Sequence, residues 1–160
     1  MASMLTIREG VPRRQLGSQL GWFLLWLGTT AVAFYLSPNS AGHGTHQSLG
    51  LPPCPSVLAV GRPCPGCGLT TSFALTVRGS LGEAFQAHAL GTFFYVLFST
   101  AAFLGVWGFA TRRSVELNRS WDRGILVLLI VFLGYGGIRF ATHADYATPR
   151  EEMMRGLWRR

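Results

Sequence analysis

Three long apolar runs constrain this chain more than any other feature of its sequence. They cover residues 20–36, 90–110 and 124–140, and the only charged side chain within them is Arg139. A helix needs roughly 17–25 mostly apolar residues to cross the ~30 Å hydrocarbon layer of a bilayer. The runs therefore predict an all-α integral membrane protein with three transmembrane helices.

The polar stretches between these runs set the expected organisation of the chain. A short helix is expected at Leu69–Val77, which is too short to span and would be re-entrant or interfacial. The tail is expected to form either an amphipathic surface helix or a frayed terminus. The predicted parts are a cytoplasmic basic N-terminus at 1–19, transmembrane helix 1 at 20–36, a loop with the cysteines and the short helix at 37–79, a helix containing span 2 at 80–111, transmembrane helix 3 at 124–141, and a polar tail at 142–160.

The basic charge of the chain comes from arginine alone. Its formal net charge is +7, with 14 arginines and no lysine, and the arginines flank the apolar runs. This placement is typical of topology signals and of contact with anionic lipid headgroups, and it argues against nucleic acid as a partner. Seven arginines before the first run and between the second and third predict that both segments are cytoplasmic. The lipid bilayer is thus the expected partner, and the cysteine loop is expected to face outward.

All three cysteines lie in one stretch of the loop at 37–79. Cys64 and Cys67 belong to a Cys-Pro-Gly-Cys-Gly sequence, and Cys54 precedes them. The same spelling builds metal-binding turns in zinc ribbons and rubredoxins, and two thiolates from one turn make half of a tetrahedral zinc site. The cysteines and His88 are therefore candidate metal ligands, with His43 and His46 as alternatives to His88. Zinc is the candidate cofactor.

Three other interpretations of the cysteines remain open. A Cys-x-x-Cys pair before a helix has a favoured thiolate, which predicts a membrane thiol–disulfide oxidoreductase acting on the outer face through Cys64 and Cys67. Cys54 could instead form a structural disulfide with either of them. The cysteines could also pack as small apolar residues in a rigid turn without any chemistry. The residues expected to shape that turn are Pro55, Pro63, Pro65, Gly66, Gly68 and Gly79.

The stretch that follows Gly79 has the pattern of a helix N-terminus. Ser80 and Glu83 match a capping box, and a helix can run from there without a proline to about Thr111. Its first third, with Glu83 and His88, is too polar for lipid and should project from the membrane or face the cysteines. Arg139 is expected to reach headgroups, a helix carbonyl, or Glu83 across an antiparallel hairpin.

The motif spelling resembles an uncharacterised bacterial family of small membrane proteins, a domain of unknown function marked by a C-P…G-x-P-C-P-G-C-G-L-T-R box. The resemblance rests on Cys54-Pro55, residues 61–70, Arg78-Gly79 and Ala84-Phe85, and it covers about residues 51–142. It implies a few transmembrane helices in a multi-pass protein of the inner membrane, with no assigned activity. Two positions depart from the family: Thr71 replaces its arginine, and His88-Ala89 replaces its Asn-Pro pair.

The sequence does not favour an enzyme. It contains no Ser–His–Asp set, no phosphate-binding loop and no carboxylate pair inside an apolar run. We therefore expect a non-catalytic accessory or structural subunit of a membrane complex, with other membrane-protein subunits as partners. The thiol–disulfide oxidoreductase is the alternative.

Overall fold

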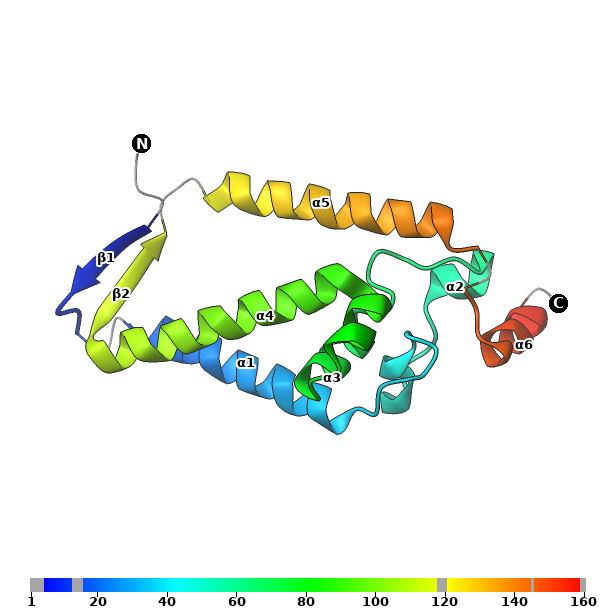
Figure 1. Ribbon diagram of the computed structural model, residues 1–160, viewed down its shortest axis with the longest axis horizontal. Helices are drawn as coiled ribbons and strands as arrows, with labels where there is room; N and C mark the ends of the chain where they lie inside the picture. The colour runs from blue at the N-terminus through cyan, green and yellow to red at the C-terminus, as the bar shows by residue number, and fades with distance from the viewer. Residues whose placement is uncertain (1–4, 13–15, 118–120, 145, 159–160) are drawn as a thin grey trace.

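Three long helices run across the molecule and share their ends. The computed structural model describes residues 5–12, 16–117, 121–144 and 146–158. Helix α1 (Gly17–Tyr35) ends, α4 (Leu81–Thr111) begins and α5 (Trp121–Thr142) ends at the same side, which we call the cysteine end (Figure 1). That end also holds the short elements: η2 (Thr45–Leu49), α2 (Pro55–Val60), α3 (Leu69–Val77) and α6 (Pro149–Trp158).

The opposite end contains a strand pair, so the all-α prediction is wrong at this point. Strand β1 (Leu5–Glu9) pairs antiparallel with β2 (Arg113–Leu117), with Leu5 opposite Leu117 and Glu9 opposite Arg113. One strand precedes α1 and the other follows α4, so no hairpin turn between them signals the pairing. The pair connects the beginning of α1 to the segment between α4 and α5.

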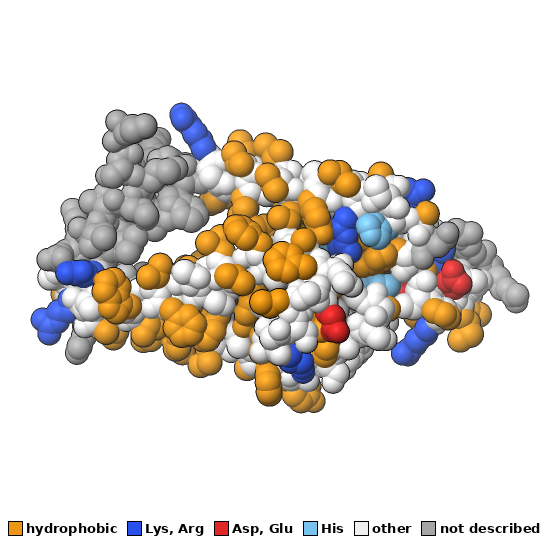
Figure 2. All heavy atoms as spheres, in the orientation of Figure 1, with side chains coloured by type: hydrophobic (Ala, Val, Ile, Leu, Met, Phe, Trp, Pro, Cys, Tyr) orange, Lys and Arg blue, Asp and Glu red, His pale blue; other side chains and the backbone are white. Residues whose placement is uncertain are grey.

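Two of the long helices are apolar enough to cross a membrane. They are Leu81–Thr111 and Arg123–Thr142, and only 22% and 11% of their most apolar stretches are buried. Helix α1 is not among them, because its 19 residues include Ser18, Gln19 and two threonines. Figure 2 shows hydrophobic side chains along the visible face of these helices, with charged side chains gathered toward their ends.

The end of α3 explains why the predicted capping box does not form. Arg78 is the C-cap of this helix and Gly79 follows it with a φ of 79°. The Ser80 N–H donates to the Leu75 carbonyl (3.1 Å) and the Gly79 N–H to the Thr76 carbonyl (3.0 Å). Ser80 precedes α4, but its side chain makes no capping hydrogen bond. A capping box requires Glu83 to accept the Ser80 N–H, which is already bound to Leu75. The Ser80–Glu83 capping prediction is therefore wrong.

Helix α4 bends at His88, which has non-helical backbone angles (φ −164°, ψ 97°). The Gly91 N–H, which a regular helix would direct to the Ala87 carbonyl, donates instead to Nδ1 of His88 (2.8 Å). The freed Ala87 carbonyl accepts a hydrogen bond from Nη2 of Arg139 on α5 (3.0 Å). At the bend, the helical hydrogen bond between Gly91 and Ala87 is replaced by two others, one from Gly91 to the His88 ring and one from Arg139 to Ala87. The polar first turns of α4 remain beside the cysteine segment.

Helix α5 is fixed through its second half. The Tyr135 hydroxyl accepts the Ala89 N–H at the bend of α4 (3.2 Å), and Phe132 lies parallel to the His88 ring. Gly136 faces Pro65 so closely that an added Cβ would overlap the proline ring. The absence of a side chain at position 136 therefore sets how near α5 comes to the cysteine segment.

The Gly136→Ala substitution tests this packing. We expect it to destabilise the protein by about 1–3 kcal/mol, because the new methyl group must push α5 away from Pro65. The matched control is Gly137→Ala, since a Cβ at Gly137 meets nothing within 4 Å. Thermal unfolding in detergent micelles, followed by circular dichroism, compares the variants. Equal melting temperatures for both variants would contradict the close contact.

Candidate metal centre

The three cysteines converge at the cysteine end from two separate segments. Cys54 immediately precedes α2, while Cys64 and Cys67 lie in the turn that leads into α3. The three Sγ atoms lie within 4.8 Å of one another, and those of Cys64 and Cys67 are 3.3 Å apart. All three are free thiols. The structure therefore brings together the three cysteines that the sequence analysis selected.

The turn around Cys64 and Cys67 has backbone groups directed at sulfur. The Cys64 N–H approaches the Sγ of Cys67 (3.3 Å), and the Cys67 N–H donates to the Cys64 carbonyl (3.0 Å). Gly68 closes the turn with a φ of 88°, and a Cβ there would collide with the Ala87 carbonyl. Such an arrangement of a tight turn and inward N–H groups stabilises negative charge on sulfur.

The other predicted turn residues have distinct places. Pro55 is the first residue of α2. Proline has no N–H, but no helical hydrogen bond is lost here because the first N–H groups of a helix have no partner within it. Pro63 is fully buried, and Pro65 contacts Gly136 of α5. The Gly66 carbonyl accepts the Leu69 N–H (3.1 Å) and so continues the turn into α3.

The two close thiols have opposite acidities. A hydrogen bond from the Cys67 thiol, working against burial, lowers the pKa of Cys64 from 9.0 to about 5. The same hydrogen bond, together with burial, raises the pKa of Cys67. The first proton to leave the metal-free cluster therefore comes from Cys64, and its charge is shared with the neighbouring thiol.

The sulfur positions fit three corners of a tetrahedral metal site. With Zn–S bonds of about 2.3 Å, ligand sulfurs in a tetrahedral zinc site are about 3.8 Å apart. The observed separations, from 3.3 Å to no more than 4.8 Å, bracket that value. Thiolates select soft or borderline ions such as Zn²⁺ and Cu⁺ over Mg²⁺ or Ca²⁺. Cys54, Cys64 and Cys67 could therefore hold one such ion.

His88, the predicted fourth ligand, lies outside this group. Its Nδ1 accepts the Gly91 N–H, so its Nε2 carries the proton and donates to the Pro65 carbonyl (2.9 Å). The side chain is fully buried, and both ring nitrogens have backbone partners. The structure thus gives His88 a supporting position, in which it joins the bend of α4 to the cysteine turn.

The cysteines line a cavity of about 280 Å³ that also contains His43, His46, Thr71 and Glu151. His43, an alternative candidate ligand in the sequence analysis, is buried. Its Nδ1 faces the Ala41 carbonyl (3.1 Å) and its Nε2 faces Glu151 Oε2 (3.1 Å). Both ring nitrogens thus face oxygen atoms. His43 therefore has no nitrogen left for the metal, and the fourth position faces the cavity.

Glu151 is a site residue that the sequence analysis missed. It belongs to α6, in the tail expected to be a surface helix or frayed, yet it is only 2% exposed. Its oxygens accept hydrogen bonds from the Thr148 N–H (2.9 Å) and Gln47 Nε2 (2.9 Å) as well as from His43. The sequence shows two acidic residues, Glu151 and Glu152, where α6 begins. Only the hydrogen bonds from His43 and Gln47 show that Glu151 is the one in the site.

The docking of α6 should depend on pH through Glu151. Burial alone would raise the pKa of Glu151, but hydrogen bonds from Thr148, His43 and Gln47 outweigh it, so the pKa lies below the ordinary 4.5. A carboxyl group with a lowered pKa stabilises the folded state fully above its unfolded pKa, and that stabilisation disappears as pH falls through the lower folded value. We expect α6 to stay docked at pH 5 and to detach only below pH 4.5.

The Thr148 amide resonance in ¹⁵N NMR reports this step, because that N–H is bound to Glu151. The Glu151→Gln variant is the control and should show no acid transition at Thr148. A transition above pH 4.5 in the unmodified protein would contradict the assignment.

The fold and the site together define a mainly helical protein with a cysteine cluster where its long helices end. Residues 54–102 match the family model described as "Protein of unknown function (DUF2752)", so this part of the chain carries that domain and the resemblance noted from the motif is confirmed there. The match begins at Cys54 and ends within α4. Neither the curated proteins nor the solved structures contain a match to this chain.

The two residues at which the sequence departs from the family motif both have hydrogen-bond partners in the structure. Thr71, at the position of the family's arginine, is buried and its hydroxyl is 2.8 Å from that of Thr45. His88, at the first position of the family's Asn-Pro pair, interrupts α4 by accepting the Gly91 N–H on its ring. A helix interruption is thus present at this position without a proline.

Proposed function

We propose that this protein is a membrane-embedded, non-catalytic accessory subunit whose cysteine end is locked by a zinc ion bound to Cys54, Cys64 and Cys67. The observation that carries the proposal is the convergence of three Sγ atoms within 4.8 Å from two segments of the chain. A bound ion would tie the beginning of α2 to the turn before α3. Structural metal sites stabilise short irregular segments in this way.

The fourth coordination position is open toward the cavity of about 280 Å³. A closed structural site has four protein ligands, whereas a site with three keeps a place for water or an external donor. His43 and His88 have both ring nitrogens engaged. We infer that water, or a donor from another subunit, completes the site.

Membrane insertion is supported by the exposed apolar surfaces of the long helices. The core helix of a soluble protein would be mostly buried, but the apolar stretches of α4 and α5 are only 22% and 11% buried. Beyond its bend, residues 89–111 of α4 extend ~34 Å, enough for the hydrocarbon layer. Helix α1 lies beside α4 with shared ends (Figure 1), and we propose it as the third span. The arginine distribution favours a cytoplasmic strand pair and an outward cysteine end.

The accessory role is supported by the way α5 packs. The contacts that hold it come from its second half, while large apolar side chains such as Ile125 and Leu129 are exposed in its first half. Another membrane subunit could pack there. Purification in mild detergent tests this role, which predicts a co-purifying partner; a lone monomer would count against it.

Metal analysis tests the zinc site directly. Protein purified without chelator should contain about one zinc per chain, and Cys54→Ser should reduce this to roughly a tenth, because a bound metal needs every thiolate. Elemental analysis together with thiol titration under native conditions provides the measurement. His143→Gln is the control, since His143 is exposed and does not line the cavity beside the cysteines. Metal-free protein with three freely titrating thiols would refute the site.

Thiol–disulfide exchange is the second candidate, favoured by the 3.3 Å separation of the Cys64 and Cys67 sulfurs. The Cys64 thiolate would attack a substrate disulfide and release one substrate thiolate. The Cys67 thiolate would then attack the mixed disulfide, leaving the substrate as two thiols and the protein with a Cys64–Cys67 disulfide.

The Cys54→Ser variant separates the two candidates. Exchange needs only Cys64 and Cys67, so an oxidoreductase would retain its reduction of a model disulfide in this variant. A zinc site would lose its metal and show no turnover in either form. Mass spectrometry after differential alkylation shows which cysteines cycle.

A further inference from the structure

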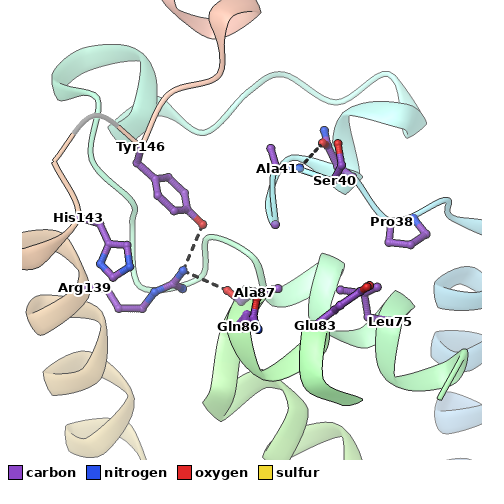
Figure 3. Close-up of a pocket in the computed structure, with 12 residues that line it drawn as sticks. Pro38, Ser40, Ala41, Leu75, Glu83, Gln86, Ala87, Arg139, His143 and Tyr146 are labelled. Atoms are coloured by element: carbon purple, nitrogen blue, oxygen red, sulfur yellow. Dashed lines mark hydrogen bonds between the residues drawn. The ribbon is translucent and has the colours of Figure 1, made fainter. Parts of the chain in front are cut away.

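A second cavity at the cysteine end has the chemistry of a binding site. It measures about 650 Å³ and lies between the loop at residues 38–42, the first turns of α4 and the end of α5 (Figure 3). Arg139, His143, Tyr146, Gln86 and Glu83 line it. None of these residues belongs to the proposed zinc site, so this cavity needs its own explanation.

Arg139 is a buried cation whose hydrogen-bond partners are all neutral. It is 6% exposed, and its guanidinium donates to the carbonyls of Cys67 (2.7 Å) and Ala87 (3.0 Å) and to the Tyr146 hydroxyl (3.2 Å). The rings of Tyr135 and Tyr146 flank it at 5.8 and 5.7 Å. Within the described part of the chain, no carboxylate forms an ion pair with it. The negative charge shared by the Cys64 and Cys67 sulfurs offsets part of the cost of burying this cation, and an anion in the cavity would offset more of it.

The guanidinium retains donors for such an anion. Arginine has five N–H groups; the three bonds above use both hydrogens of Nη2 and one of Nη1, which leaves the Nε hydrogen and one Nη1 hydrogen as single donors for a ligand. In Figure 3 the side chain points into the cavity beside His143, with Tyr146 above it. A charged N–H donor forms short, strong hydrogen bonds to phosphate oxygens, also through a single bond. The inner part of the cavity therefore suits a phosphate group.

The side of the cavity opposite Arg139 carries a negatively charged residue, Glu83. Glu83 is exposed on the first turn of α4, and Figure 3 places it across the cavity from Arg139. A carboxylate there disfavours a bare, multiply charged anion and favours a ligand that has an amine near its phosphate. Arg139 and Glu83 together thus select a zwitterion.

The position of the cavity relates it to the membrane surface. It lies where α1 and α5 end and α4 begins, which is the level of the lipid headgroups if these helices span the bilayer. We propose that it binds a phosphodiester that carries an amine, the chemistry of an ethanolamine phospholipid headgroup and of free glycerophosphoethanolamine, with phosphate at Arg139 and amine at Glu83. The membrane lipid is the expected source.

Native mass spectrometry of the full chain in detergent, titrated with phosphatidylethanolamine, tests the proposal. The unmodified protein should bind one lipid, and Arg139→Gln should weaken binding at least ~10-fold, as expected for a lost charge-assisted pair. Because Arg139 also joins parts of the fold, Gln86→Phe provides an independent test: Gln86 is exposed, and a ring there would fill the cavity. Arg62→Gln is the matched control, since Arg62 also binds a backbone carbonyl of α5 but does not line the cavity.

Further ligands identify the chemistry and its source. Phosphatidylglycerol should bind more weakly than phosphatidylethanolamine, and Glu83→Gln should remove that difference. Displacement of the lipid by equimolar glycerophosphoethanolamine would overturn the membrane lipid as the source, and displacement by equimolar inorganic phosphate would overturn the amine contact. Unchanged lipid binding in folded Gln86→Phe and Arg139→Gln variants would overturn the site itself.

Discussion

The guanidinium of Arg139 holds the cysteine end together. It binds the Cys67 carbonyl of the metal turn, the Ala87 carbonyl exposed by the bend of α4, and the Tyr146 hydroxyl in the segment that leads to α6. One side chain thus binds backbone carbonyls from two separate segments of the chain. The position of α5 is therefore coupled to the geometry of the cysteine turn.

His88 completes this arrangement from the other helix. Its ring accepts the Gly91 N–H and donates to the Pro65 carbonyl, so the bend of α4 and the turn around Cys64 and Cys67 are parts of one hydrogen-bonded network. Each bond in the network stabilises a backbone group that regular structure has left free. Such networks specify a single geometry, because removing one member leaves a buried polar group unsatisfied.

The proposed zinc site and the proposed headgroup cavity adjoin this network on different sides. Cys67 contributes its thiol to one and its carbonyl to Arg139, which lines the other. Tyr146 likewise stacks on His43 near the zinc cavity and bonds to Arg139 at the headgroup cavity. A ligand in one site would thus contact residues that position the other site, so the two sites at the cysteine end share part of their support.

The sequence by itself determined the helices and the cysteine group. Long apolar runs have few stable alternatives to a helix, and α1, α4 and α5 lie over the three runs. Gly79 fixed the end of α3, and the Cys-Pro-Gly-Cys spelling fixed the turn. These features depend on residues that are close together in the sequence, so local sequence patterns predict them.

Only the tertiary structure decided the roles of His88, Arg139 and Glu151, and the pairing of β1 with β2. Each depends on a partner far along the chain: Pro65 for His88, Ala87 for Arg139, His43 for Glu151. The capping box failed for a related reason, because the Ser80 N–H had two possible acceptors and the end of α3 took it. A hydrogen-bonding group has many chemically equivalent partners, and packing selects among them.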